Sequence, residues 1–214
     1  MQDVLEQLKA GIRRFQTEVY PQQAEMYQRA VIEPQEPHTF FIACADSRID
    51  PELITQSKPG ELFALRNIGN MIPPYGEMMG GVSAVVEYAV ALLKVKHIVV
   101  CGHADCGAMN GLLHPESVTS LLAVKNWLTN AAAALRVAEV LGEKHQGVPV
   151  ELKRRVTEQN VLLQIQHLKT HPSVAEAMAR EELTISGWVY EIGTGEVRIW
   201  EEAAKEFVPV RGAA

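Results

Sequence analysis

Cysteine is scarce in this chain, with three residues among 214. Three is a small and odd number for a disulfide framework, which secreted domains build from several paired cysteines. Core packing, metal binding and thiol reactivity remain as explanations. The three cysteines are therefore candidate ligands or core residues rather than crosslinks.

An excess of basic side chains is also absent. The chain has 26 acidic and 20 basic residues, which gives a formal net charge of -6. Proteins that bind nucleic acid or anionic membranes carry a basic face. The composition therefore predicts a small-molecule partner, with no nucleic acid and no membrane.

Long apolar runs are missing too. The longest strongly apolar stretch, residues 82–95, is interrupted by Glu87 and Lys94 and is shorter than the roughly 20 residues that span a bilayer. Near the N-terminus, apolar residues recur at helical spacing with charges between them, which favours a docking helix over a signal peptide. These residues are Val4, Leu8, Ile12 and Phe15. We expect a cytoplasmic protein.

Length and pattern predict one α/β domain over residues 1–214, because 214 residues bury one substantial core but hardly two. Compact apolar runs at 39–45, 61–66 and 97–101 are typical of buried parallel strands. A hairpin is expected from 183–192 and 196–200 around a Gly-Thr-Gly turn. Helical patterns cover 4–19, 22–31, a stretch from about 81, 107–141 and 151–169, with a break at 142–149. We expect a three-layer fold: a mainly parallel sheet of four strands plus an added C-terminal strand, flanked by helices.

Side chains that bind metals follow two of the expected strands. Cys44, Asp46 and Arg48 follow the first, and residues two apart in an extended segment point to the same side. His103 and Cys106 follow the third strand, where a tight turn brings both round one ion. Ligands of open α/β sheets bind beyond the carboxyl ends of the strands. The two segments therefore predict one site assembled by the fold.

Two cysteines and one histidine make three protein ligands, which is the arrangement of catalytic zinc, whereas structural zinc usually has four. Two thiolates cancel the charge of Zn²⁺, so neighbouring groups must help to hold a bound water as hydroxide. Asp46 is placed to become a fourth ligand, but Arg48 offers a planar fork that holds this carboxylate away from the metal. We therefore predict that Asp46 and Arg48 act as a gate.

The pattern Cys44-x-Asp46-Ser47-Arg48 with His103-x-x-Cys106-Gly107 closely resembles the β-class carbonic anhydrases. The resemblance runs from about residue 35 to 113 and more loosely to 188–190. It includes the segments Pro59-Gly60-Glu61, Arg66-Asn67-Ile68 and Glu87-Tyr88-Ala89. It implies one Zn²⁺ per subunit and reversible hydration of carbon dioxide to bicarbonate and a proton, by attack of zinc-bound hydroxide.

The resemblance also implies a substrate pocket of Gln35, Phe63 and Tyr88, with the backbone N–H of Gly107 near a substrate oxygen. These residues match the plant-like branch, whose zinc is open to water. In the other branch, a tryptophan three positions before the first cysteine helps bicarbonate to lock the aspartate on the metal. Phe41 stands at that position here. We therefore predict no bicarbonate-driven closure.

A homodimer or homotetramer is a further implication, with active sites at the subunit interface. Isolated helices are marginally stable in water, so we expect the helical segment 1–34 to pack as an arm on a partner subunit.

Two other functions stay open. One keeps the fold and the zinc but hydrolyses a related heterocumulene, carbon disulfide or carbonyl sulfide. The other is a noncatalytic zinc-stabilised or redox-binding protein, in which Cys101 joins the site as a fourth ligand. Burial in an apolar strand also explains Cys101.

Overall fold

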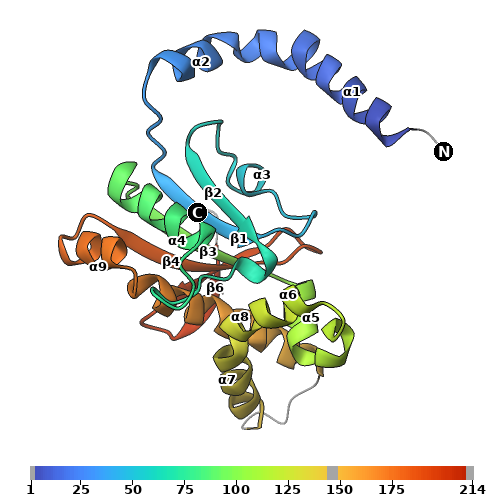
Figure 1. Cartoon of the computed structure of the whole chain (residues 1–214), viewed down its shortest axis with the longest axis vertical. Coiled ribbons are helices and arrows are strands. Elements are labelled where there is room, and N and C mark those ends of the chain that lie inside the picture. The colour runs from blue at the N-terminus through green and yellow to red at the C-terminus, as the bar shows by residue number, and fades with distance from the viewer. Residues whose placement is uncertain (1–2, 144–148, 211–214) are drawn as a thin grey trace. The chain divides into compact units, whose positions relative to one another are not determined.

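The computed structural model describes residues 3–143 and 149–210, which Figure 1 shows. The chain divides into two compact units, Met1–Glu36 and Pro37–Ala214. One domain over 1–214 with an arm over 1–34 stays a prediction.

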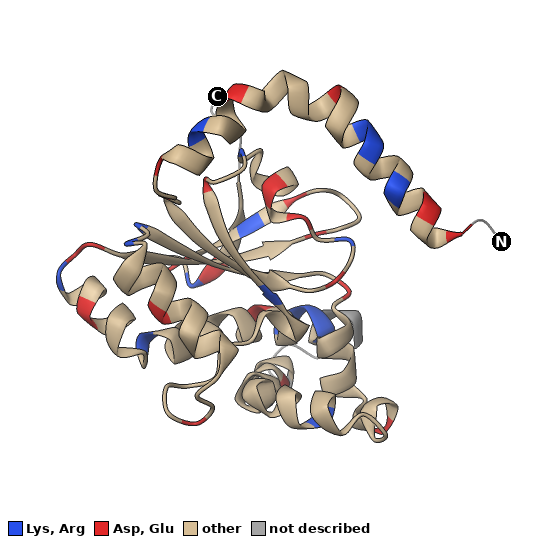
Figure 2. Ribbon diagram, turned by 45° about the horizontal axis from the view of Figure 1, so that its top comes forward, with Lys and Arg blue, Asp and Glu red and all other residues tan. Residues whose placement is uncertain are grey.

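The first unit is helical throughout most of its length. It contains α1 (Val4–Arg14), a π-helical turn η1 (Phe15–Val19) and α2 (Tyr20–Ile32), so the two predicted helices run on without a break. Asp3 caps α1, because its Oδ1 accepts the Leu5 N–H at 3.0 Å. Charges of both signs follow one another along α1 (Figure 2), while its apolar residues stay exposed. The exposed fractions are 68% for Val4, 62% for Leu8 and 56% for Ile12, and Phe15 at the start of η1 is 41% exposed.

A six-stranded sheet with the order β2-β1-β3-β4-β5-β6 organises the second unit. The strands are β1 (Thr39–Cys44), β2 (Leu62–Asn67), β3 (His97–His103), β4 (Thr184–Tyr190), β5 (Val197–Glu201) and β6 (Glu206–Pro209). Strands β1 to β4 pair in parallel, whereas β5 pairs antiparallel with β4 and β6 pairs antiparallel with β5. The predicted mainly parallel α/β fold is confirmed, but the C-terminal addition has two strands instead of one. The sequence pattern does not predict β6, because this strand is four residues long and ends in proline.

Helices connect and cover the strands. They are α3 (Pro51–Thr55), η2 (Ile68–Asn70), α4 (Gly81–Glu87), η3 (Tyr88–Leu92), α5 (Gly107–Leu113), η4 (Pro115–Val118), α6 (Leu122–Leu128), η5 (Thr129–Ala131), α7 (Ala132–Glu143), α8 (Pro149–Lys169) and α9 (Pro172–Ala179). The short helices α3 and α9 were not predicted. The expected break at 142–149 includes 144–148, which lie outside the described residues. Among the described helices, none combines the length and apolarity that a membrane crossing requires.

The core covers both faces of the parallel strands. Phe40 and Ile42 of β1 pack into a cluster with residues of α4, α8 and α9, whereas Phe41 and Ala43 point into a second cluster that includes Ile54 of α3. All four β1 side chains have no exposed surface. Burial on both faces explains why this strand has a continuous apolar run instead of an alternating one.

Two glycines let α8 lie directly on the sheet. A Cβ at Gly102 of β3 would come within 2.8 Å of Val161, and one at Gly187 of β4 would come equally close to the same side chain. Neither glycine has a left-handed backbone, so close approach rather than conformation requires them. The contact brings the polar face of α8 to the carboxyl end of β3.

Candidate metal centre

The candidate ligands lie where the strand order reverses. The neighbours of β1 are β2 on one side and β3 on the other, so the connections that leave β1 and β2 depart in opposite directions. Crevices at such switch points, beyond the strand carboxyl ends, are the usual ligand sites of open α/β sheets. Cys44 ends β1 and His103 ends β3, and the turn after β3 carries Cys106.

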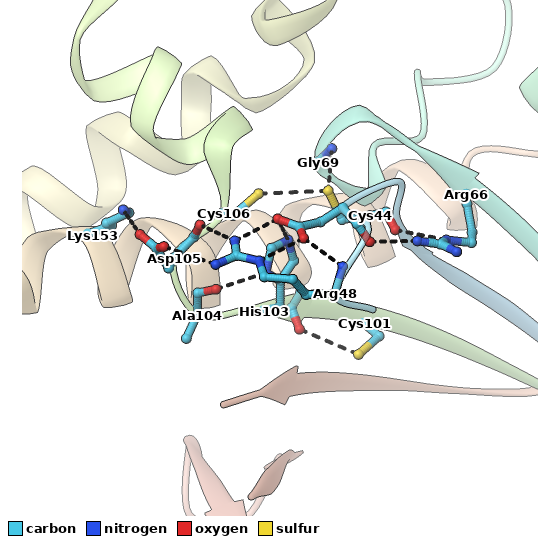
Figure 3. A network of polar contacts seen from close by, with 12 residues as sticks. Cys44, Arg48, Arg66, Gly69, Cys101, His103, Ala104, Asp105, Cys106 and Lys153 are labelled. Carbon is cyan, nitrogen blue, oxygen red and sulfur yellow. Dashed lines mark hydrogen bonds and ion pairs between the residues drawn. The ribbon is translucent and has the colours of Figure 1, made fainter. Parts of the chain in front are cut away.

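Cys44, His103 and Cys106 converge as predicted. Their ligand atoms all lie within 4.8 Å of one another, and the three side chains are buried. The two Sγ atoms are 4.0 Å apart. Figure 3 shows the two sulfur atoms facing each other above the histidine ring. Two sulfurs and one nitrogen at this spacing suit tetrahedral Zn²⁺.

The orientation of His103 tests whether a metal fits. Its Nδ1 donates to the carbonyl oxygen of Ala104 at 2.8 Å, so Nε2 is left as the unprotonated ring nitrogen. This Nε2 is buried and has no hydrogen-bond partner among the described residues. A buried polar atom without a partner is costly, and a metal ion beside the two sulfurs satisfies it. The donor set therefore fits Zn²⁺.

Backbone N–H groups support the two thiols. The Gly69 N–H donates to Cys44 Sγ at 3.4 Å. The Cys106 thiol, His103 and this N–H lower the pKa of Cys44 to about 4, against the effect of burial. The hydrogen bond to Cys44 and burial raise the pKa of Cys106, although the N–H groups of Met109 and Ala108 at the start of α5 act in the opposite direction. Because zinc binds thiolates, metal binding displaces the proton that the pair retains.

Asp46 and Arg48 form the predicted ion pair. The guanidinium Nε donates to Asp46 Oδ1 at 2.9 Å and Nη2 donates to Oδ2 at 2.7 Å, and the Arg48 backbone N–H adds a third bond at 3.0 Å. These bonds hold the pKa of Asp46 well below its usual range. Asp46 Oδ2 lies only 3.9 Å from His103 Nε2. The carboxylate therefore borders the metal position while Arg48 holds it.

Three more residues, for which no role was predicted from the sequence, complete this network. Arg66 donates to the backbone oxygens of Cys44 and Asp46 at 3.1 and 2.6 Å, which fixes the turn that carries the site. Asp105 accepts from Arg48, and Lys153 of α8 donates to Asp105 at 2.6 Å. In the sequence, only the position of Asp105 next to Cys106 indicates that its carboxylate could belong to the site. Nothing in the sequence indicates Lys153, since only the fold brings α8 to the metal centre.

The predicted substrate residues are not all at the metal centre of their own chain. Gly107 is the first residue of α5, beside Cys106. Phe63 and Tyr88 stack with their ring centroids 5.8 Å apart, but Phe63 pairs with Phe40, four residues before Cys44. Four strand residues correspond to roughly 13 Å, so Phe63 lies about this far along the sheet from Cys44. Gln35 is an exposed residue of the first unit, after α2.

Cys101 does not join the group. Within the described residues, the metal-binding cluster consists of Cys44, His103 and Cys106 alone. Cys101 packs with Phe41 and Val99, and burial raises the pKa of its thiol to about 12. The alternative with four structural ligands therefore has no support in the geometry. Three protein ligands at the switch point of an α/β sheet define the class as a zinc protein of the catalytic type.

The comparisons with known proteins identify the family. A family model described as carbonic anhydrase matches residues 39–197. A carbonic anhydrase of Pseudomonas aeruginosa is 43% identical over 208 residues, which cover 97% of this chain and 91% of the relative. The solved β-carbonic anhydrase CcaA has a TM-score of 0.91 at 36% identity, over 96% of this chain and 99% of that one. A tetrameric β-carbonic anhydrase of Sordaria macrospora has a TM-score of 0.68 at 30% identity, over 91% and 92% of the two chains.

The chain belongs to the carbonic anhydrase family, in its β class. Its activity is the reversible hydration of carbon dioxide, its substrate is a small molecule and its cofactor is zinc.

Proposed function

We propose that Cys44, His103 and Cys106 hold the catalytic Zn²⁺ and that Asp46 and Arg48 control access to its fourth position. The observation that carries this proposal is the buried Nε2 of His103, which has no hydrogen-bond partner in the described part of the chain and faces two thiols beside the carboxylate that Arg48 holds. Bound there, zinc supplies a Lewis acid that makes hydroxide available near neutral pH.

The role of Asp46 follows from its hydrogen bonds. With both carboxylate oxygens occupied by Arg48, Asp46 stays off the metal and keeps a free lone pair toward the site. It accepts a hydrogen bond from the attacking water and so fixes the direction of that water's lone pair. The backbone N–H of Gly107, in the first turn of α5, donates to a substrate oxygen on which negative charge develops.

The substrate pocket needs a second copy of the chain. Phe63 and Tyr88 lie too far along the sheet to reach the metal of their own chain, and Tyr88 is 43% exposed. We assign this stacked pair, with Gln35, to the pocket of a neighbouring subunit in a homodimer or homotetramer. Two features support this: β2 is an edge strand of the sheet, and the solved relative from Sordaria macrospora is tetrameric.

Phe41 supports assignment to the plant-like branch. Its ring is fully buried and meets Trp188 edge-on at 5.7 Å. It has no N–H with which to bind bicarbonate, as a tryptophan would. We therefore expect no loss of the metal's water ligand when bicarbonate is added near neutral pH.

We also propose a cytoplasmic location. Cys44 and Cys106 lie 4.0 Å apart and must both stay reduced to bind zinc, and a reducing compartment keeps them so.

Stopped-flow hydration of carbon dioxide, measured together with zinc content, tests the gate. Asp46→Asn keeps the shape but loses the charge that Arg48 holds, and Arg48→Ala releases Asp46 toward the metal. We expect both variants to keep zinc and to lose roughly 100-fold in kcat, as for the loss of a group that acts on a proton in the reaction. Full activity in both variants would contradict the gate hypothesis. Sulfide release from carbon disulfide by the wild-type protein would point to the alternative substrate.

A further inference from the structure

The gate pair is held by a second ion pair outside it. Arg48 Nη1 donates to Asp105 Oδ2 at 3.3 Å, and Nη2 donates to the Asp105 backbone oxygen at 3.2 Å. The other carboxylate oxygen of Asp105 accepts from Lys153 Nζ at 2.6 Å. Figure 3 shows Lys153, Asp105 and Arg48 following one another toward the metal position.

Geometry makes Asp105 an anchor for the far edge of the guanidinium. Asp46 binds Nε and Nη2, so Nη1 is directed at Asp105. Arg48 is 45% exposed, and an exposed arginine that has one partner only is weakly restrained. Anchoring both edges fixes the plane in which the fork meets Asp46.

Lys153 restrains Asp105 in turn. The Asp105 side chain is 67% exposed and would otherwise rotate freely, whereas the Lys153 side chain is 28% exposed. Asp105 also has a left-handed backbone, with φ of 56°, and both its carbonyl oxygen and its side chain accept hydrogen bonds from Arg48. The chain of contacts thus begins on α8 and ends at Asp46.

We propose that Asp105, held by Lys153, is a positioning residue that keeps Arg48 on Asp46 and thereby keeps the metal's fourth position open. This rests on the proposed gate function. Without the Asp105–Lys153 pair, Arg48 loses one anchor and Asp46 spends more time on the metal. A ligand that needs the open position then binds more weakly, in proportion to the lost open population.

Binding of thiocyanate to the cobalt-substituted full-length protein, followed by visible absorption, measures the open fourth position without any need for activity. We expect Asp105→Asn to weaken thiocyanate binding threefold to tenfold and Lys153→Met about threefold. The double variant should equal Asp105→Asn alone, because Lys153 acts through Asp105. Lys169→Met, which removes an exposed lysine from the same helix, is the control and should bind as wild type does.

The sign of the Asp105→Asn effect separates positioning from simple charge. Removing a negative charge near the metal strengthens anion binding if only electrostatics acts, whereas loss of the anchor weakens it. Asparagine also tolerates the left-handed backbone, so the fold is kept, and thermal unfolding checks this.

Unchanged or tighter thiocyanate binding by Asp105→Asn, or additive effects in the double variant, would overturn the inference. The proposed function fails separately, if wild type binds no metal or hydrates no carbon dioxide.

Discussion

At the residue scale, Cys44 and Cys101 carry the same thiol in opposite environments. Cys44 faces Cys106, the Gly69 N–H and His103, and these lower its pKa to about 4. Cys101 faces apolar side chains, which raise its pKa to about 12. One thiol is therefore prepared for metal binding and the other for packing.

Serine replacements of these two cysteines form a matched pair. Cys44→Ser removes a thiolate ligand, so we expect zinc content to fall from one per chain to less than about 0.1, with loss of hydration activity. Cys101→Ser buries a hydroxyl at a cost of about 1–3 kcal/mol but should keep zinc and activity. Atomic absorption and stopped-flow assays measure both quantities. Zinc loss in Cys101→Ser with retention in Cys44→Ser would reverse our ligand assignment.

The spacing of residues in the sequence predicts only part of the site. The ligands and the Asp46–Arg48 pair follow two strands within a few positions, so local geometry predicts which side chains share a face, and neighbouring parallel strands bring the two groups together. Arg66, Asp105 and Lys153 were not predicted, because no motif at a strand end marks them and their contacts, 20 to 57 positions apart, depend on packing. No local pattern encodes such contacts.

At the element scale, side chains of α8 support the metal centre through hydrogen bonds. Besides Lys153, it supplies Asn160, whose Nδ2 donates to the Gly69 carbonyl oxygen at 3.0 Å. Gln164 donates to Asn160 Oδ1 at 2.9 Å and accepts from the Ile72 N–H at 2.8 Å. These buried amides hold the loop after β2, whose Gly69 N–H reaches Cys44.

A methyl group at Gly102 tests the close packing of α8. The new Cβ in Gly102→Ala would lie 2.8 Å from Val161 and 3.1 Å from Thr157, so α8 must shift. We expect a loss of about 1–3 kcal/mol in the free energy of unfolding, from overpacking. Gly81→Ala, where a Cβ meets no atom within 4 Å, is the control. Urea unfolding measures both, and equal stability of the two variants would show that the contact is not tight.

At the scale of the whole molecule, the N-terminal unit leaves an apolar stripe exposed. Leu8 and Ile12 of α1 are 62% and 56% exposed, which is unusual for a helix with one apolar face. The expected packing of this arm on a partner subunit would cover the stripe.

Introducing charges on the stripe tests assembly. We expect the double variant Leu8→Glu/Ile12→Glu to sediment as a smaller species than wild type, because two buried charges disfavour the interface by several kcal/mol. Arg14→Glu changes the charge of the same helix away from the stripe and should leave the size unchanged. Analytical ultracentrifugation decides, and identical sedimentation of all three proteins would contradict docking of α1.

Buried histidines predict how stability depends on pH. Burial lowers the pKa values of His97, His167 and His171, while the unfolded chain titrates near 6.5. Below about pH 6.5 the unfolded state therefore binds more protons, so stability is full above this pH and decreases as the pH falls toward the lowered values. The lowered carboxyl pKa values of Asp46 and Asp105 act only below about pH 4.

We expect the free energy of unfolding to decrease between pH 7 and 5 and the decrease to be smaller in His167→Gln. His167 donates from Nδ1 to the Ile72 carbonyl oxygen, and glutamine can retain this bond. His114→Gln, at an exposed site, controls for the loss of a histidine. Urea titrations at several pH values give the slopes, and equal slopes for wild type and His167→Gln would contradict the assignment.

The sequence by itself determined the parallel sheet, the hairpin at its C-terminal end and the group of Cys44, His103 and Cys106 that could bind a metal. Apolar runs of strand length, with ligands placed directly after them, are local patterns that can be recognised without knowing how the elements pack. The helices α3 and α9 were not determined in this way, since five and eight residues give too weak a helical period, and β6 has four residues and ends in proline.

Tertiary structure alone decided which distant groups meet at the ligands. It placed α8 on Gly102 and Gly187, and with it Lys153 and Asn160, and it separated Phe63 and Tyr88 from the metal of their own chain. The physical reason is that packing between a helix and a sheet depends on the shapes of both surfaces, which residues far apart in sequence create together.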